Sequence, residues 1–353
     1  MSLSLSDRLT GCLLGTAVGD ALGLPYEGLS RGRGQRLLGL PNRYRLLGPY
    51  GFVSDDTEHA CMTAQALIAS GGIPARFADD LAWRLRWWLL ALPAGIGLAT
   101  LRAIIKLWLG FSADRAGVFS AGNGPGMRAA ILGAAVVERD QLQELIHYST
   151  YLTHTDPKAE QGAWVIALAT RLACEQDVVS PQQFLKEVET SLDETAQELL
   201  TLIYQAVRSV EKKETTPAFA QSLGLEKGVS GYMFHTVPVV IHAWLSYPHN
   251  YEQAVQALIV CGGDTDSTAA MAGGIIGAAV GKAGIPKKYL EKLVEWPRTV
   301  DWMQRLAEQL AEARVQQCPL RPVSLPFWGV WIRNLGFMLI VLGHGLRRLA
   351  PPW

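Results

Sequence analysis

Two acidic segments, residues 54–56 and residues 264–267, contain the side chains best suited to metal-dependent chemistry. Neighbouring carboxylates repel one another unless a cation or strong hydrogen-bond donors compensate. Carboxylate and hydroxyl oxygens together form the all-oxygen shell that Mg²⁺ and Mn²⁺ prefer. If the two segments meet in space, they predict a site for two divalent ions, which would orient a substrate and lower the pKa of a bound water. The side chains that would bind the ions are those of Ser54, Asp55, Asp56, Asp264, Asp266 and Ser267.

Helix capping is the purely structural alternative for both segments. Ser54 or Asp55 could begin a helix, with Glu58 completing a capping box. Asp264 could begin a second helix in the same way, because an acidic residue is favourable at a helix start. For each segment taken alone, capping remains an open alternative.

The spacing of Asp264, Asp266 and Thr268 also fits the phosphatase pattern D-x-D-x-T, with Asp264 as the nucleophile. That class places the motif at the end of a buried strand, usually early in the chain, with a lysine and paired acids downstream. Here the apolar run 257–261 would have to be the strand. The motif comes late, two glycines precede it, and no paired acidic motif follows it.

Three shorter features could complete a site. The glycine-rich segment 121–128 precedes a predicted helix, where free backbone N–H groups bind phosphate, although a plain loop fits equally well. His154 precedes another predicted helix and could donate to a pyrophosphate, although a lone histidine is usually structural. Glu27, next to the aromatic Tyr26, is a candidate general base or a gate over the site, and an exposed loop carboxylate is the alternative.

Helices must position these residues, because apolar side chains recur at helical rather than alternating spacing along the chain. The pattern predicts an all-α, multi-helix protein from about residue 5 to about residue 315. Residues 8–23 form a predicted helix with a small-residue face, which would let a neighbouring helix approach closely. The other predicted helices cover residues 56–69, 128–138, 158–174, 192–212, 232–246, 251–261 and 267–281.

Composition narrows the class of protein and its partners. The chain has 353 residues, of which 49% are hydrophobic and 18% charged, as in a globular protein. Lys plus Arg equals Asp plus Glu at 32 each, so no net charge would attract nucleic acid, and none is expected as a partner. The five cysteines are scattered in apolar helical surroundings, which fits a reducing compartment. The first residues lack the features of a signal peptide, and a cytoplasmic location is expected.

The tail, residues 321–353, differs from the body formed by residues 1–320. It is strongly apolar and contains no acidic residue, and Gly329, Gly336 and Gly343 recur every seven residues. Its uninterrupted apolar core, residues 335–342, is too short to span a bilayer. Four interpretations remain open for this predicted helix: docking on the body, self-association with a second copy, attachment to a membrane surface, and a true membrane span that would have to include Arg333 and Asn334.

Taken together in chain order, these motifs resemble the ADP-ribosylglycohydrolase family, which includes the enzyme that reactivates dinitrogenase reductase. The resemblance spans residues 11–286, and the set of motifs is far more specific than any one of them. The matching segments are GCLLGTAVGDALGLPYE, SDDT, GNGPGMRAAILGAA, THTDPKA, GYMFHTVPVVIHAW and GGDTDSTAAMAGGIIGAAVGKAGIP.

The resemblance implies an all-α fold with two Mg²⁺ or Mn²⁺ ions at the base of a cleft, bound by the six side chains named above. It implies hydrolysis of the bond between ADP-ribose and a protein side chain, arginine more than serine, with Asp55, Asp56 or Glu27 assisting the water. Two departures from the family pattern are Pro125, which removes an N–H donor, and Ser267, which keeps a hydroxyl. The implied substrate-binding residues are Gly122, Asn123, Gly124, Gly126, His154, Tyr232 and His235.

Two further hypotheses stay open. The chain could be a catalytically silent relative that only binds ADP-ribose, or the phosphatase described above. The segment 76–118, rich in Trp and Arg, lies between the first acidic segment and the glycine-rich loop and could shape selectivity for the modified side chain.

Overall fold

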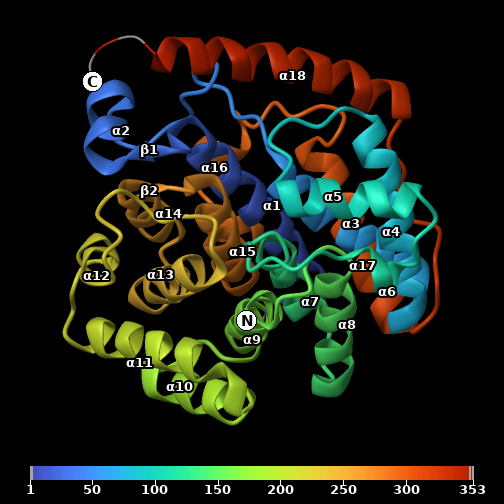
Figure 1. Ribbon diagram of the computed structural model, residues 1–353, viewed down its shortest axis with the longest axis horizontal. Coiled ribbons are helices and arrows are strands. Elements are labelled where there is room, and N and C mark those ends of the chain that lie inside the picture. Colours follow the sequence, from blue (N-terminus) through green and yellow to red (C-terminus); the bar gives the residue numbers. More distant parts are fainter. Residues whose placement is uncertain (1–2, 350, 352–353) are drawn as a thin grey trace.

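The computed structural model describes residues 3–349 and residue 351, and almost all of its regular structure is helical (Figure 1), which confirms the predicted all-α fold. Two two-residue strands, β1 (Leu29–Ser30) and β2 (Gly262–Gly263), pair antiparallel. Three short 3₁₀ helices are η1 (Leu24–Tyr26), η2 (Gly126–Arg128) and η3 (Glu194–Ala196). The α-helices are α1 (Leu5–Gly23), α2 (Arg31–Leu38), α3 (Asp55–Ser70), α4 (Pro74–Leu90), α5 (Leu98–Trp108), α6 (Ala113–Ala116), α7 (Ala129–Ala135), α8 (Arg139–Tyr151), α9 (Pro157–Glu175), α10 (Pro181–Glu189), α11 (Gln197–Glu211), α12 (Thr216–Ser222), α13 (Met233–Ser246), α14 (Tyr251–Cys261), α15 (Thr265–Gly284), α16 (Lys287–Leu290), α17 (Val300–Gln316) and α18 (Phe327–Arg348).

The centre of the molecule is the α1–α15 seam, the line along which these two helices touch through small residues (Figure 1). A Cβ added to Gly15 would lie 2.1 Å from the carbonyl oxygen of Gly273, and one added to Gly277 would lie 2.1 Å from that of Gly11. Since real Cβ atoms never come so close to backbone, glycine is required on both sides of the seam. The predicted small-residue face of the first helix is thereby confirmed, and its neighbour is α15.

The sequence prediction of individual helices holds well where apolar periodicity is strong. The predicted helix 251–261 coincides with α14, and the predicted helix 232–246 is α13, which tolerates an internal Pro238. The run 257–261 therefore belongs to a helix, which removes the buried strand that the phosphatase interpretation requires. The segment 76–118, left without assigned elements, contains most of α4 and all of α5 and α6.

Helix α18 lies across one edge of the body (Figure 1) and is held there by its inner face. Phe337 on this face joins a small apolar cluster with Leu24, Leu46 and Ala94 from the body. Asn334 is fully buried and donates to the carbonyl oxygen of Ala91 at 2.8 Å. By length and composition, α18 is the one helix in the described chain that could cross a membrane. In this structure it docks on the body.

Candidate functional site

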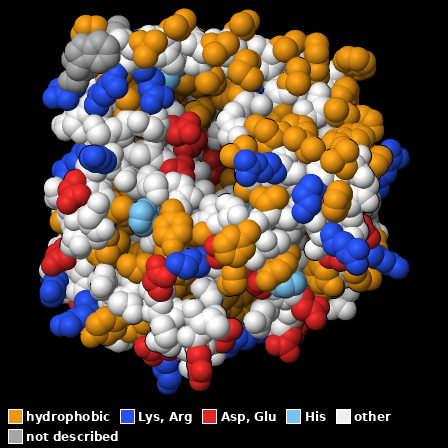
Figure 2. Space-filling view, viewed as in Figure 1, with side chains coloured by type: hydrophobic (Ala, Val, Ile, Leu, Met, Phe, Trp, Pro, Cys, Tyr) orange, Lys and Arg blue, Asp and Glu red, His pale blue; other side chains and the backbone are white. Residues whose placement is uncertain are grey.

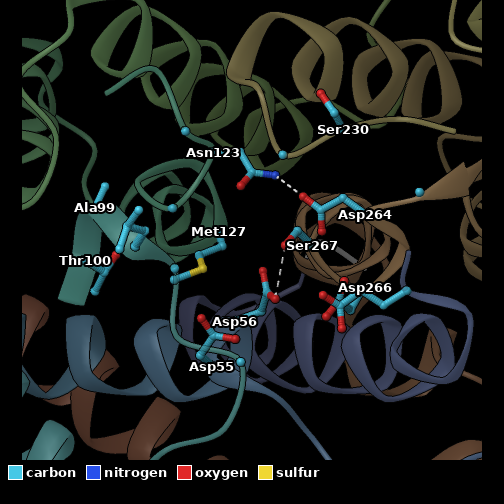
Figure 3. A pocket seen from close by; sticks show the side chains of 18 of the residues that line it. Asp55, Asp56, Ala99, Thr100, Asn123, Met127, Ser230, Asp264, Asp266 and Ser267 are labelled. Atoms are coloured by element: carbon cyan, nitrogen blue, oxygen red, sulfur yellow. Dashed lines mark hydrogen bonds between the residues drawn. The ribbon is translucent and has the colours of Figure 1, made fainter. Parts of the chain in front are cut away.

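The two acidic segments meet, although more than two hundred residues separate them in sequence. Ser54 caps α3 and Asp264 caps α15, so both helices point their N-termini at the same space. Figure 3 shows Asp55 and Asp56 facing Asp264 and Asp266 across a cavity. The Ser267 hydroxyl donates to Asp56 Oδ2 at 3.2 Å and thus links the two segments directly. The positive ends of both helix dipoles stabilise the negative charge gathered there.

Asp20, which was not among the predicted site residues, fixes the start of α3. This fully buried side chain on α1 accepts the Ser54 N–H at 2.9 Å and the Thr57 N–H at 3.2 Å. Burial raises the pKa of Asp20 to about 7, and the donated hydrogen bonds oppose that rise. The predicted capping box is not formed, because Glu58 turns away to Arg298, at 2.6 Å. Asp20 therefore positions the first acidic segment from the α1–α15 seam.

Three chain segments cross beneath Asp264 and set its position relative to Glu27. In the β1–β2 pair, Leu29 lies opposite Gly263, and the Gly28 N–H donates to the Gly263 carbonyl oxygen at 2.7 Å. Val229 accepts the Asp264 N–H, also at 2.7 Å. Gly263 has a φ of +84°, and an added Cβ would lie 2.0 Å from the Val229 oxygen. Glycine at this position is what allows the crossing.

The acidic residues line a cavity of about 550 Å³ that opens on the face shown in Figure 2, where carboxylates lie at the bottom of a hollow. Segment 95–100, from the α4–α5 loop and the start of α5, forms one wall of it. The exposed tryptophans of the same region, such as Trp83 and Trp108, lie at the surface and do not line it. No lysine or arginine is among the described lining residues, which are Glu27, Gly28, Asp55, Asp56, Gly95, Gly97, Leu98, Ala99, Thr100, Ser120, Gly122, Asn123, Gly124, Met127, His154, Val229, Ser230, Gly231, Gly263, Asp264, Asp266 and Ser267.

The glycine-rich loop reaches the cavity, but little of its backbone is free. The Asn123 side chain donates to Asp264 Oδ2 at 2.6 Å (Figure 3), while its backbone N–H donates to the Gly231 oxygen. The Gly122 and Gly126 N–H groups also have acceptors, at 3.3 and 2.8 Å. Among the described loop residues that line the cavity, the Gly124 N–H alone has no acceptor and is left to bind a phosphate.

His154 lies against this loop, and its imidazole leaves little room for a side chain at two of the glycine positions. A Cβ on Gly122 would lie 3.1 Å from His154 Nε2, and a Cβ on Gly124 would lie 3.0 Å from its Cε1. Thr153 Oγ1 contacts His154 Nδ1 at 2.8 Å and accepts a hydrogen bond from the buried Arg128. Burial, with Arg128 nearby, lowers the pKa of His154 to about 3. The ring is therefore neutral at pH 7 and offers a hydrogen bond without charge.

Four of the predicted residues do not line the cavity. Ser54 is buried beneath it, where its hydroxyl donates to Asp56 at 3.1 Å. Gly126 lies behind the loop against Met271, because its N–H is used to close the turn. Tyr232 and His235 line a neighbouring surface hollow instead. The Tyr232 backbone pairs with Gly122 of the glycine-rich loop, and Lys158 donates to the Tyr232 hydroxyl at 2.9 Å. The predicted role of Tyr232 and His235 in binding the ligand stays a prediction.

Two carboxylate oxygens in the site lack any donor. Asp56 Oδ1 and Asp266 Oδ1 are buried and have no hydrogen-bond partner among the described residues. Burial raises the pKa of both carboxyls, and neighbouring carboxylates raise each further. In the described part of the chain, no group of three or more His, Cys, Asp or Glu side chains is arranged to hold a metal ion. The donors nonetheless fit a hard divalent cation in kind, because all are oxygens and two carry unpartnered charge.

A buried ionic network supports the first acidic segment from behind. Arg333 of α18 donates to the Val53 carbonyl oxygen at 2.6 Å and pairs with Glu295 at 2.7 Å. Glu295 in turn accepts the Val53 N–H at 3.2 Å. Val53 immediately precedes Ser54, so α18 contributes to holding the acidic segment in place. At the other end of α18, His344 contacts the Pro25 oxygen at 2.9 Å, two residues before Glu27.

Comparison with known proteins shows which family the chain resembles. The sequence profile of ADP-ribosylglycohydrolase matches residues 1–320. An uncharacterised protein of Archaeoglobus fulgidus is 31% identical over 320 residues, covering 88% of this chain and 98% of that protein. ADP-ribosylhydrolase ARH3 of Gallus gallus is 26% identical (88% and 94% covered).

Two further similarities concern a bacterial enzyme and a solved structure. The ADP-ribosyl-[dinitrogen reductase] glycohydrolase of Rhodospirillum rubrum is 24% identical, with 82% of this chain and 91% of that enzyme covered. A solved ADP-ribosylglycohydrolase-related protein complex superposes with a TM-score of 0.63 and 27% identity over 88% of this chain and 99% of the other. This chain belongs to the ADP-ribosylglycohydrolase family, whose enzymes hydrolyse ADP-ribose linkages.

Proposed function

We propose that this chain hydrolyses the bond between ADP-ribose and a modified arginine side chain, using two Mg²⁺ or Mn²⁺ ions. The observation that carries the proposal is the charge of the cavity, which is lined by five carboxylates and by no lysine or arginine among the described residues. Five negative charges and two divalent cations, −5 + 4, leave one negative charge. A guanidinium linkage is cationic and suits that remaining charge better than a neutral serine linkage does.

The chemistry assigns distinct tasks to the two sides of the cavity. Divalent ions, when bound, supply Lewis acidity to ribose oxygens and to water. Asp56 and Asp266 would hold them with oxygens that have no other partner, assisted by the Ser267 hydroxyl. As the glycosidic bond breaks, the distal ribose gains oxocarbenium character, which the surrounding carboxylates stabilise. Asp55, or Glu27 at the exposed mouth, is placed to accept a proton from water.

The opposite wall would bind the remainder of ADP-ribose. The Gly124 N–H and the neutral His154 ring are the donors available to the phosphates. Since neither is charged, phosphate binding would rest on hydrogen bonds alone, and the pyrophosphate would lie away from the carboxylates. Asn123 joins the two walls through its bond to Asp264.

A direct assay tests both the substrate and the metal. Purified protein is incubated with peptides carrying ADP-ribosyl-arginine or ADP-ribosyl-serine, with Mg²⁺, with Mn²⁺ or with a chelator, and released ADP-ribose is measured. We expect release from the arginine peptide that stops with the chelator, returns with added metal, and falls at least about a hundredfold in Asp264→Asn. Asp301→Asn, an exposed acid at the start of α17, is the matched control.

Other outcomes redirect the proposal. Metal-independent release, or full activity in Asp264→Asn, would overturn the metal mechanism. Preference for the serine peptide would overturn the assignment of arginine as the modified side chain. Tight binding of ADP-ribose without turnover in any metal would favour the silent relative.

A further inference from the structure

The outer face of α18 is apolar and exposed along its whole length. It consists of seven large side chains between 41% and 71% exposed, namely Trp328, Ile332, Leu335, Leu339, Leu342, Leu346 and Leu349. Their spacing alternates between four and three residues, which places them on one side of a helix. A helix on a water-facing surface normally turns polar side chains outward, and an exposed apolar stripe of this length marks an interaction surface.

Aromatic rings from a second helix extend this face at the N-terminal end of α18. Trp83 and Trp87 of α4 contact each other with ring centroids 5.7 Å apart, and Trp87 contacts Phe327 at 5.8 Å. Phe327 in turn contacts Trp328 at 5.7 Å. Tryptophan rings favour the boundary between hydrocarbon and water, because they are apolar with one polar N–H.

Two basic stretches of chain meet at the C-terminal end of α18, where Glu27, beside Arg348, is the acidic neighbour. Residues 28–54 contain five arginines and no acidic residue, and residues 315–353 contain four arginines and no acidic residue, although the whole chain is balanced. Arg33 of α2 donates to the carbonyl oxygen of Arg348, so the two basic regions lie side by side at the C-terminal end of α18. Arg31, Arg36 and Arg347 there are exposed. This arrangement complements anionic headgroups.

We propose that the outer face of α18 binds the surface of an anionic phospholipid bilayer, with the leucines inserted among the acyl chains and the arginines at the headgroups. The inner face argues for peripheral attachment over a transmembrane span. Leaving the body would carry Arg333 and Asn334 into hydrocarbon and would leave Glu295 buried without its partner. Figure 2 shows the apolar side chains along the top edge and the carboxylate-lined hollow on the adjoining face. Docking would therefore leave the site open beside the membrane.

Vesicle flotation of the full-length protein tests this proposal. The vesicles contain phosphatidylcholine alone or phosphatidylcholine with phosphatidylglycerol. We expect strong binding to the anionic vesicles, weakened at least about tenfold in Leu339→Gln/Leu346→Gln because two inserted side chains become polar. Arg36→Gln/Arg347→Gln should lose about fivefold per arginine on anionic vesicles and little on neutral ones.

The control variant replaces two apolar side chains of similar exposure at other positions on the surface. Val137→Gln/Val178→Gln changes side chains 69% and 66% exposed, against 71% and 69% for Leu339 and Leu346, and should bind vesicles as the parent does. Circular dichroism and thermal unfolding verify that each variant is folded. No binding by the parent, or unchanged binding by the leucine variant, would overturn the proposal. A dimer in sedimentation experiments that the leucine substitutions abolish would also overturn it, because a second copy would then cover the face.

Discussion

Helices α15 and α18 are the two longest apolar helices of the protein, and both contain glycine at helical spacing. The glycines nevertheless have different surroundings in the two helices. In α15, Gly273 and Gly277 touch the backbone of α1, and no Cβ fits at either position. In α18, Gly336 and Gly343 have nothing within 4 Å of where a Cβ would stand. Glycines at helical spacing therefore mark a close helix contact in α15, whereas in α18 Gly329 packs against Trp296 and Gly336 and Gly343 face open space.

The difference extends to the polar residues of each helix. The N-terminus of α15 brings Asp264, Asp266 and Ser267 into the cavity. The polar residues of α18, above all Arg333 and Asn334, face the body from behind the site and are not among the described lining residues. Under the proposed function, α15 would supply reacting groups, whereas α18 supports the site. Four substitutions can break or sharpen this contrast.

The largest expected effect is a loss of stability on substitution of Arg333 in α18. Arg333→Met keeps an unbranched apolar stem but removes the guanidinium, which leaves Glu295 buried without its cation. Breaking one side of a buried ion pair costs about 3–5 kcal/mol, so the free energy of unfolding in urea should fall by that amount. The double variant Arg333→Met/Glu295→Gln should recover part of the loss. If the double variant loses the sum of both single changes, the pair is not coupled as the structure indicates.

Next comes the reacting end of α15. Asp266→Asn should lower the rate of ADP-ribose release at least about a hundredfold, because it removes charge at a buried oxygen that has no other partner. The measurement is single-turnover release at saturating Mg²⁺, compared with the exposed Asp301→Asn. An equal loss of rate in Arg333→Met, with the protein still folded, would erase the distinction between reacting and supporting helices.

A smaller effect is expected at the α1–α15 seam. Gly277→Ala would place a Cβ 2.1 Å from the Gly11 carbonyl oxygen, so the two helices must move apart. We expect a loss of about 1–3 kcal/mol in the free energy of unfolding, the usual cost of overpacking a core. Denaturation in urea measures it, and a stability equal to that of the parent would show that the seam can widen freely.

The smallest expected effect is in α18, and it is a gain in stability, whereas the other substitutions cause a loss of stability or rate. Gly336→Ala introduces a methyl group into open space and removes a flexible residue from a helix interior. The variant should gain about 0.5–1 kcal/mol in the same urea experiment. Destabilisation at this position would mean that a neighbour covers Gly336 in solution, for example a second copy of the chain.

Sequence reasoning succeeded where short motifs carry both the chemistry and the helix boundary. Both acidic segments, 54–56 and 264–267, lie at the start of a helix. The small-residue face of α1 correctly predicted that another helix packs closely against it. The pattern did not reveal Asp20 as a site residue, although an acid inside an apolar helix was a usable signal, because its partners lie more than thirty residues away.

The sequence did not predict how side chains are oriented or which residues distant along the chain pair with one another. Arg333 lies just before the apolar core 335–342 in sequence, and only the fold shows that it meets Glu295 and Val53. Tyr232 was expected near the ligand because it lies beside the right loop, but its hydroxyl is held by Lys158 outside the cavity. Helical spacing predicts which residues share a face and does not predict which neighbour that face meets.

The pairing of α1 with α15 has a consequence for synthesis of the chain. Every residue from Leu9 to Gly23 is buried in the finished protein, and the helix that covers much of that surface is made more than two hundred residues later. At roughly 5–20 residues per second, a ribosome needs on the order of 10–50 s to deliver it. The nascent N-terminal helix must therefore wait in a provisional environment, such as a chaperone, before the carboxylates can assemble.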